Sequence, residues 1–395
     1  MNPNFESKLM TLLDDHRSEI IELRRYLHEH PEVSFHEKNT AAFIKDYYSN
    51  LDCKMRDCGD GYGIVVDINP DKPGKKLAWR ADFDGLAIQE DNNLPFKSQN
   101  PGVMHACGHD GHTAYLLVLA KCLIELKDEI NGSIRIIHQP AEEVAPGGAL
   151  SMIKDGALDG VDDIYGIHVM STMPTGTVQL HSGPTQTGRA NFDLTFTGKG
   201  GHASMPQLSN DAIVAGSYFV TELQTIVSRR LNPFDVGSVT IGSFDGAGSY
   251  NAIKGQVKLK GDVRVMNEDT RKKIRQQIEQ IVNGVDATFG VESKLDYDDN
   301  YPVLINDKKL TENAEKWIKE SNIPEVTTVK DSGVVNASED FAYFAQKKPG
   351  CFFYVGCQPA DGGDYPHHSP SFMMDEDCLI ICAKSAASVI SHYFA

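Results

Sequence analysis

Four short segments contain residues whose side chains bind metals or transfer protons. In the densest of them, residues 104–113, His105, Cys107, His109 and His112 fall within eight positions. Thiolate and imidazole are preferred ligands of zinc and similar divalent metals, and a loop that leads into a helix can direct several of them to one point. This density favours a metal site over a set of polar residues at a helix start. A second interpretation remains, in which Cys107 is a nucleophile and His109 its base.

The other three segments add carboxylates and imidazoles. Glu142 and Glu143 follow the apolar stretch 133–139, His168 ends the apolar stretch 164–169, and the segment 366–370 reads Pro-His-His-Ser-Pro. Each alone also fits a solvated turn or a buried histidine. Open α/β sheets bind ligands at the carboxyl ends of their strands, so we expect these residues to gather at one sheet edge. One carboxylate can then bind a metal while the other acts as a general base, which is the inventory of a two-metal hydrolase.

The elements that position these residues alternate between short apolar strands and helices, as in an α/β domain with a mainly parallel sheet. Residues 5–50 predict two helices broken at Pro31, because proline does not fit a helix interior. The remaining predicted strands are 63–69, 76–82, 133–139, 163–169 and 351–356, and the helices are 111–127, 147–154, 307–321, 338–347 and a last one that ends at Phe394.

The pattern changes near Gly183, where strands begin to alternate between apolar and polar residues, as half-buried strands do. A strand around 192–197, a helix, two strands, a helix that starts at Asn267 and a last strand at 291–297 give the order β-α-β-β-α-β, which is typical of a split ferredoxin-like unit. We therefore expect an α/β catalytic domain of residues 1–182 and 300–395, interrupted by an inserted α+β domain of residues 183–299.

Composition excludes several classes of protein. The 395 residues include 38 Lys and Arg and 55 Asp and Glu, a net charge of −17, which disfavours nucleic acid and anionic membrane surfaces as partners. No apolar run approaches the ~20 residues of a membrane span, and the start of the chain has no secretory signal pattern. The eight cysteines are dispersed rather than paired. We expect a reduced, cytoplasmic protein.

Seven motifs, in order along nearly the whole chain, resemble those of the amidohydrolase branch of the cocatalytic-zinc exopeptidases. This branch includes hippurate hydrolase, N-acetyldiaminopimelate deacetylase and indole-acetyl-amino-acid hydrolase. The motifs are WRADFDGL at 79–86, MHACGHDGH at 104–112, QPAEE at 139–143, GIHV at 166–169, GGHASMP at 200–206, ASEDFAYF at 337–344 and HSPSF at 368–372. The resemblance implies a zinc-exopeptidase-like catalytic domain with an inserted lid and dimerisation domain.

The resemblance also assigns roles to residues of the catalytic domain. It implies that two divalent metals are held by five side chains, those of Cys107, His109, Glu143, His168 and His368. Cys107 would bridge the metals as a thiolate, Glu142 would be the general base, and Asp84 would orient the site. Asp82, His105 and His112 would support the site or the fold, and His367 would not be a ligand. We expect zinc, and manganese, cobalt and nickel fit the same ligands.

In the inserted domain, His202 matches a histidine that reaches toward the partner subunit's active site and stabilises the oxyanion. Asn251 and Arg264 match positions that contact the substrate carboxylate, and the lid implies a homodimer. The chain departs from its relatives at Gln207, where they often carry a histidine. This departure leaves the lid contacts, and with them the specificity, open.

The expected reaction is hydrolysis of the amide bond in an N-acyl amino acid or short peptide, next to a free carboxylate. A peptidase of the carboxypeptidase or dipeptidase type, acting on unblocked peptides, is the alternative within the same chemistry. A thiol hydrolase would leave Glu142, Glu143, His168 and His368 without a role. A non-catalytic binding protein on the same fold would be expected to lack a ligand or the base, and none is missing.

Overall fold

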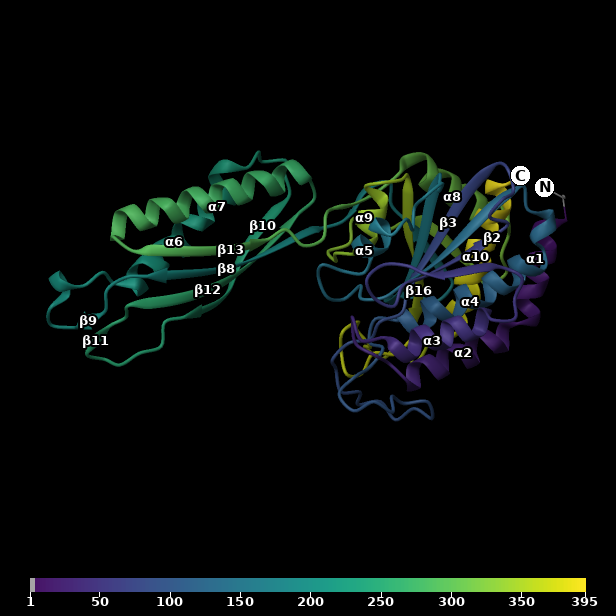
Figure 1. The fold of residues 1–395 in the computed structure, drawn as a ribbon, viewed down its shortest axis with the longest axis horizontal. Coiled ribbons are helices and arrows are strands. Elements are labelled where there is room, and N and C mark those ends of the chain that lie inside the picture. Colours follow the sequence, from purple (N-terminus) through teal and green to yellow (C-terminus); the bar gives the residue numbers. More distant parts are fainter. Residues whose placement is uncertain (1–3) are drawn as a thin grey trace. The chain divides into compact units, whose positions relative to one another are not determined.

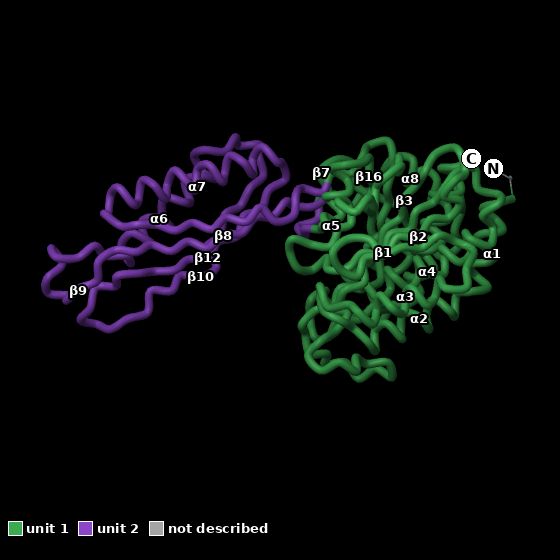
Figure 2. Tube along the Cα trace, in the orientation of Figure 1, with its two compact units in different colours: residues 1–185, 305–334, 339–395 green, residues 186–304, 335–338 purple. Residues whose placement is uncertain are grey.

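The computed structural model describes residues 4–395, which form two compact units (Figure 2). The first unit runs up to Thr185 and also contains Ile305–Val334 and Glu339–Ala395. The second consists of Gln186–Leu304 and Val335–Ser338. The chain thus returns to the second unit for the four residues 335–338, a crossing that the sequence analysis does not anticipate.

The first unit contains an eight-stranded sheet in the order β1-β2-β4-β3-β5-β16-β6-β15 (Figure 1). Its central strands β4, β3, β5 and β16 are parallel, and antiparallel pairings flank them. The mixed α/β fold confirms the predicted fold class. The strands are β1 (Lys54–Asp57), β2 (Ile64–Ile68), β3 (Lys75–Asp82), β4 (Gly132–Gln139), β5 (Asp163–Pro174), β6 (Thr177–Leu180), β15 (Thr328–Asp331) and β16 (Gly350–Gln358), and β7 (Gly183–Gln186) pairs with β14 (Leu304–Asn306) at the junction between the units.

Helices cover this sheet, and α2, α4 and α10 pack against one another (Figure 1). The helices of this unit are α1 (Phe5–Asp15), α2 (Arg17–Glu29), α3 (Lys38–Tyr48), α4 (His109–Glu125), the 3-10 turn η1 (Lys127–Glu129), α5 (Ala149–Lys154), α8 (Lys308–Glu320), α9 (Phe341–Ala345) and α10 (Asp377–Tyr393). Among the described residues, no helix is long and apolar enough to cross a bilayer.

Two predictions about these elements are wrong in detail. Residues 5–50 form three helices rather than two, because the chain also turns at His16, which lets α1 and α2 each bury an apolar face. The strand that contains His168 does not end at Val169. β5 continues to Pro174 because its pairing with β16 continues that far, so His168 lies inside the strand.

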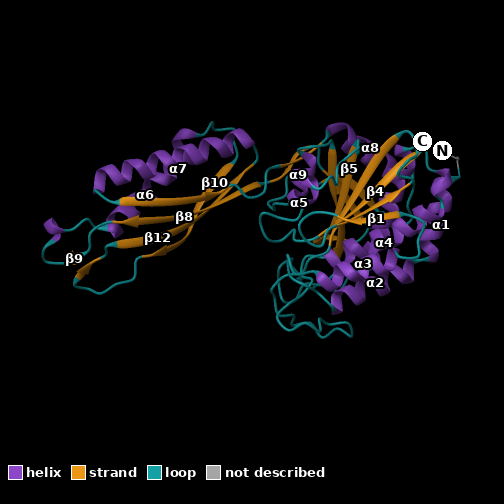
Figure 3. Ribbon diagram, in the orientation of Figure 1, coloured by secondary structure: helices purple, strands orange, loops and turns teal. Residues whose placement is uncertain are grey.

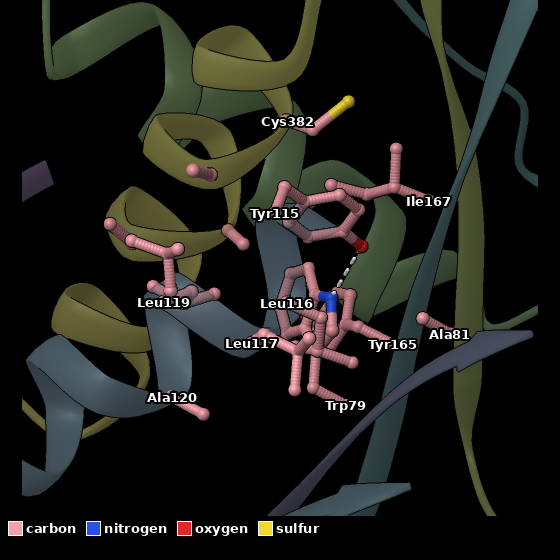
Figure 4. Close-up of a cluster of buried hydrophobic side chains, with 14 of the residues drawn as sticks. Trp79, Ala81, Tyr115, Leu116, Leu117, Leu119, Ala120, Tyr165, Ile167 and Cys382 are labelled. Carbon is pink, nitrogen blue, oxygen red and sulfur yellow. Dashed lines mark hydrogen bonds between the residues drawn. The ribbon is translucent and has the colours of Figure 1, made fainter. Parts of the chain in front are cut away.

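The core of the first unit lies between the sheet and α4, whose residues are nearly all buried. Trp79 of β3 donates an indole N–H hydrogen bond of 3.1 Å to the hydroxyl of Tyr115 on α4 (Figure 4). Its ring also stacks on Tyr165 of β5, with ring centroids 5.4 Å apart. These contacts fix α4, and with it the segment that precedes α4, against the centre of the sheet.

The second unit has a four-stranded sheet in the order β10-β12-β8-β13, with α6 and α7 packed on it (Figure 3). Along the chain this gives β8-α6-β10-β12-α7-β13, the β-α-β-β-α-β order of the sequence analysis. Asn267 caps α7, since its side chain accepts hydrogen bonds from the backbone of Asp269 and Thr270. The elements are β8 (Gly188–Thr197), β9 (Gly201–His202), η2 (Pro206–Leu208), α6 (Ala212–Thr225), the π-helical turn η3 (Ile226–Arg230), β10 (Gly237–Asp245), β11 (Ala252–Ile253), β12 (Gln256–Val265), α7 (Glu268–Phe289) and β13 (Glu292–Asp298).

Candidate metal centre

A tight turn before α4 places two of the predicted ligands. Gly108, between Cys107 and His109, has a left-handed φ of +93° and is the N-cap of α4. A Cβ atom at this position would lie 2.4 Å from Cγ2 of Val169, so only glycine fits both the conformation and the space. The turn thus brings the backbone on either side of it close against β5.

The five predicted ligands gather in overlapping groups. The ligand atoms of Cys107, His109 and His168 lie within 4.8 Å of one another, and so do those of Cys107, Glu143 and His368. Cys107 belongs to both groups, which is the arrangement a bridging ligand needs. Its Sγ lies 3.5 Å from Nε2 of His168, and Nε2 of His368 lies 3.2 Å from Oε1 of Glu143.

The lone pairs of these side chains are available to a metal. Nδ1 of His168 donates to the carbonyl of Val169 at 2.6 Å, which leaves Nε2 as the unprotonated nitrogen facing Cys107. Nε2 of His109 is buried and has no hydrogen-bond partner among the described residues, and the buried Oε1 of Glu143 has the contact with His368 given above. Buried polar atoms are normally satisfied, so an unpaired imidazole nitrogen in a thiol, imidazole and carboxylate cluster fits a pair of divalent metals.

The electrostatics of the cluster also indicate a missing positive charge. Burial raises the pKa of the Cys107 thiol well above its usual value, and the carboxylates of Glu143 and Glu142 raise it further. Burial disfavours a charged His109, yet Asp82, Asp84 and Glu143 raise its pKa to about 10. Burial is the main cause of the Cys107 shift, but buried carboxylates add to it and cause the His109 shift, and divalent cations would balance their charge. Without a bound cation, these surroundings keep Cys107 protonated, and they therefore disfavour a nucleophilic thiolate at this position.

Asp84 connects several parts of the site. Its carboxylate lies 3.2 Å from Nδ1 of His109 and accepts the hydroxyl of Ser34 at 2.7 Å. It also accepts the backbone N–H groups of Glu142 and Glu143, at 3.0 and 3.1 Å. Burial opposes ionisation, but these hydrogen bonds lower the pKa of Asp84 below its usual value. An ionised Asp84 therefore orients one predicted ligand and the loop that carries another.

The other histidines near the cluster have different partners. His112 bonds Asp82 through Nδ1 at 2.6 Å, and its Nε2 accepts the backbone N–H of Val169 at 2.9 Å, so neither nitrogen is left for a metal. Nε2 of His367 is likewise engaged by the backbone N–H of Ser171 at 3.0 Å. His105 is buried, neither of its ring nitrogens has a hydrogen-bond partner among the described residues, and burial lowers its pKa to about 4. None of the three is among the five predicted ligands.

Glu142 lies in a buried group of acidic side chains. Oε1 of Glu142 accepts the backbone N–H of Asp340 at 3.4 Å, and ligand-type oxygens of Glu142, Glu339 and Asp340 lie within 4.8 Å of one another. Burial raises the pKa of Glu142 well above its usual value, and the neighbouring carboxylates of Glu339, Glu143 and Asp340 add to the shift. Glu142 therefore holds a proton strongly, as a base in a dry site does.

The sequence analysis missed the ion network behind this acidic group. Arg80, fully buried on β3, binds Asp82, Glu339 and Asp340 at 2.6–2.9 Å. It also donates to the side chain of Gln139 at 2.8 Å. The motifs at 79–86 and 337–344 contained this signal, since each places charged residues directly beside apolar ones. Only the fold shows that the two motifs meet around a single guanidinium group.

The three remaining predicted residues belong to the second unit, where they do not form one group. His202 on β9 is exposed and pairs in register with Ala252, next to Asn251, and its Nδ1 accepts the backbone N–H of Ser204 at 3.2 Å. Arg264 lies near the other end of β12, where it donates to Asp262 at 2.9 Å and to Ser338 at 3.3 Å. Within this unit, His202 and Asn251 are neighbours and Arg264 is remote from both.

The chain resembles known proteins over nearly its full length. The model of a family described as peptidase family M20/M25/M40 matches residues 78–392. An N-acetyl-L-cysteine deacetylase of Bacillus subtilis is 36% identical over 362 residues, covering 92% of this chain and 85% of the relative. Thermostable carboxypeptidase 1 of Saccharolobus solfataricus is 35% identical over 372 residues, with 93% of each chain covered.

A solved structure extends the comparison to the metal site. The crystal structure of a dinuclear metal-binding peptidase from Bacillus subtilis superposes with a TM-score of 0.82 at 29% sequence identity. The match covers 96% of this chain and 99% of that one. The similarity thus includes both units of the fold and the region of the candidate ligands.

Proposed function

The chain belongs to the peptidase family M20/M25/M40 and is a metal-dependent hydrolase of amide bonds, and from that premise we propose that it releases the acyl group from small N-acyl amino acids. The observation that carries the proposal is the buried base Glu142 beside a five-ligand cluster with unpaired lone pairs. Relatives named as deacetylases support the substrate class. Other relatives are named as carboxypeptidases, so short unblocked peptides are the second candidate substrate class.

The ligand set supports two divalent cations, held by Cys107, His109, Glu143, His168 and His368. We propose zinc as the native metal, since thiolate and imidazole together favour it, and manganese, cobalt and nickel can occupy the same ligands. When bound, such metals polarise the scissile carbonyl and lower the pKa of water toward about 7.

Glu142 moves the proton in the proposed reaction. Its carboxylate takes a proton from the attacking water as the oxygen adds to the amide carbonyl carbon. It then gives that proton to the amine nitrogen as the C–N bond breaks, so the products are a free amine and a carboxylic acid, which loses the second proton of the water to become a carboxylate. Asp84 holds the backbone of Glu142 at 3.0 Å, which keeps the base in place during both transfers.

The second unit would complete the site across a homodimer. We propose that His202 of one protomer stabilises the oxyanion in its partner, and that Asn251 and Arg264 bind the substrate carboxylate from different protomers. Arg264 lies near the C-terminal end of β12, whereas His202 on β9 and Asn251 before β11 lie together, and this separation supports a division between two chains. Exposed apolar residues of this unit support an association surface: Ile213, Val214 and Tyr218 on α6, and Phe234, Val236 and Phe244 in and before the edge strand β10.

The first experiment would measure amine release from a panel of N-acetyl, N-benzoyl and longer N-acyl amino acids together with unblocked dipeptides. The panel would be run on the metal-loaded enzyme, after chelation, and after restoration of zinc, manganese, cobalt or nickel. We expect cleavage of acylated substrates that is lost on chelation and restored by a divalent metal. Preference for unblocked dipeptides would instead support the peptidase. Cleavage that persists after metal analysis confirms removal would contradict the proposal.

A further inference from the structure

The loop that carries Glu142 and Glu143 is held by an unusual set of backbone contacts. Three successive N–H groups, those of Ala141, Glu142 and Glu143, all donate to buried carboxylates. Two of the three go to Asp84. The third, from Ala141, goes to Oε1 of Glu37 at 2.8 Å.

Glu37 lies far from the site in sequence and was not among the residues that the motifs indicated. It is fully buried at the start of α3, and its Oε2 has no hydrogen-bond partner among the described residues. An unpartnered carboxylate oxygen in the interior is costly, so this side chain is retained despite a penalty to folding. The other carboxylate oxygen, Oε1, accepts the hydrogen bond from the backbone of Ala141, the residue before Glu142.

The backbone of Ala141 needs this contact. Its φ is +55°, in the left-handed region that residues other than glycine seldom occupy. Such a residue helps successive N–H groups to point toward a common anion. Glu37 supplies an acceptor oxygen at one end of the run and the carboxylate of Asp84 supplies two at the other, so the two side chains hold the strained turn from both ends.

A short segment before α3 contacts both Asp84 and the loop that carries Glu142. We define residues 33–37 as the brace: Val33 bridges to Gly85, Ser34 bonds Asp84, and Glu37 bonds Ala141. The brace thus touches the carboxylate that holds Glu142 and Glu143, and it touches the loop directly. It contributes no predicted metal ligand and none of the proposed proton-transferring groups.

We propose that Glu37 is a positioning residue, which sets the place of the general base Glu142 by holding the N–H of Ala141. This inference rests on the proposed function of Glu142. A loosened turn at Ala141 would shift the base relative to the scissile bond while the five ligands stay in place. Because small misplacements of a reacting group reduce rate steeply, the effect would fall on kcat rather than on KM or metal content.

Three substitutions separate hydrogen bonding from charge and from packing. Glu37→Gln keeps an acceptor oxygen at the same reach and removes the charge. Glu37→Asp keeps the charge but is one methylene shorter, and Glu37→Ala removes the group. Glu32→Ala is the matched control in the same region, since the Glu32 side chain binds Asn39 and Thr40 at the start of α3 and does not contact the loop.

The first readout is amide hydrogen exchange of the peptide that spans residues 140–144 in the metal-loaded enzyme, which needs no substrate. We expect exchange to quicken about tenfold or more in Glu37→Ala and Glu37→Asp, as for loss of one buried hydrogen bond. Glu37→Gln and Glu32→Ala should exchange as the wild type does. Wild-type exchange in both Glu37→Ala and Glu37→Asp would overturn the proposal.

The second readout is kinetic, at full metal occupancy. We expect kcat to fall about ten- to 100-fold in Glu37→Asp and Glu37→Ala, with KM within about twofold, and Glu37→Gln to recover most of the loss. If Glu37→Ala does not fold, Glu37→Asp and Glu37→Gln decide the question. Equal impairment of Glu37→Gln and Glu37→Asp would refute positioning through this hydrogen bond. An inactive wild type would instead refute the proposed function, and the exchange measurement would still decide the role of Glu37.

Discussion

At the scale of single residues, the site is built from side chains whose charges the protein does not balance by itself. Glu142, Glu339 and Asp340 lie together in the interior, and the guanidinium of Arg80 binds the last two. Burial and mutual repulsion raise the pKa of Glu142 and of Asp340 well above their usual values. This environment makes Glu142 a strong proton acceptor once cations occupy the neighbouring ligands.

The role of Glu142 as base predicts a selective loss of rate. Glu142→Gln keeps the shape and removes the proton acceptor, so we expect kcat to fall about 100- to 10 000-fold. Metal content and thermal stability should stay close to those of the wild type, because Glu142 is not among the five predicted ligands. Metal analysis and steady-state kinetics on the same preparation check this. Turnover within tenfold of the wild type would remove Glu142 from the role.

A buried histidine outside the site predicts acid sensitivity of the fold. His138 on β4 accepts the hydroxyl of Tyr48 at 2.9 Å, and burial lowers its pKa to about 3. Between about pH 6.5 and pH 3 the unfolded chain therefore binds one more proton than the folded one, so stability falls as the pH falls through this window.

We expect His138→Gln to reduce this pH dependence. Between pH 5 and 6, the slope of unfolding free energy against pH should be smaller than in the wild type by up to one proton, about 1.4 kcal/mol per pH unit. Urea unfolding of both proteins in the same chelating buffer measures the two slopes. Identical slopes would show that His138 does not stay neutral in the folded protein.

At the scale of elements, parallel strands bring the chemistry to one edge of the sheet. Asp82 ends β3, and Glu142 follows β4 by three residues, while the neighbouring β5 contributes His168 from within the strand. Parallel strands end on the same side, so the connections after β3 and β4 begin there. The turn at Gly108 then aligns the start of α4 with this edge.

Substitution of Gly108 should therefore damage the metal centre. Gly108→Ala introduces a Cβ against Val169 at a positive φ, so we expect destabilisation of about 2 kcal/mol or more and weaker metal binding. Gly102→Ala is the matched control, since Gly102 has a φ of +77° with no atom within 4 Å of the added Cβ. Thermal melts and metal titrations of the two variants test this. Equal behaviour of both would mean that the conformation, not the close approach to Val169, determines the effect.

At the scale of the whole molecule, the family match confirms the resemblance that the seven motifs indicated, since it spans residues 78–392. The second unit presents an edge strand, β10, and an exposed apolar stripe on α6. Both features are typical of a surface that associates with a second copy. Dimerisation and the action of His202 on a partner remain proposals that one experiment can test together.

Mixed dimers separate action within a subunit from action on the partner. His202→Ala and Glu142→Ala homodimers should both be nearly inactive. A verified mixed dimer should recover about half of the wild-type activity, because one of its two sites keeps Glu142 and receives His202 from the partner. Affinity tags of two kinds isolate the mixed species for assay. Absence of recovery in that species would contradict action between subunits.

The sequence by itself determined the class of chemistry and most of the architecture. Metal-ligand types cluster at 104–113, carboxylates follow an apolar strand at 142–143, and the periodicity changes near Gly183. These are local signals, because ligand chemistry, strand burial and helix amphipathicity are each encoded within about ten to 20 residues of chain. They predicted the α/β fold and an inserted α+β unit, whereas the family was indicated by the resemblance of the seven motifs.

Only the tertiary structure decided how distant groups combine. Arg80 meets Glu339 and Asp340 across more than half of the chain, and Glu37 reaches the backbone of Ala141. The sequence shows which residues are charged, and the motifs place charged residues beside apolar ones, but neither shows which groups pair, because a buried ion pair or hydrogen bond depends on where distant segments come together. The resemblance had already separated His168, a predicted ligand, from His112, and the structure adds that both ring nitrogens of His112 are engaged while Nε2 of His168 faces Cys107.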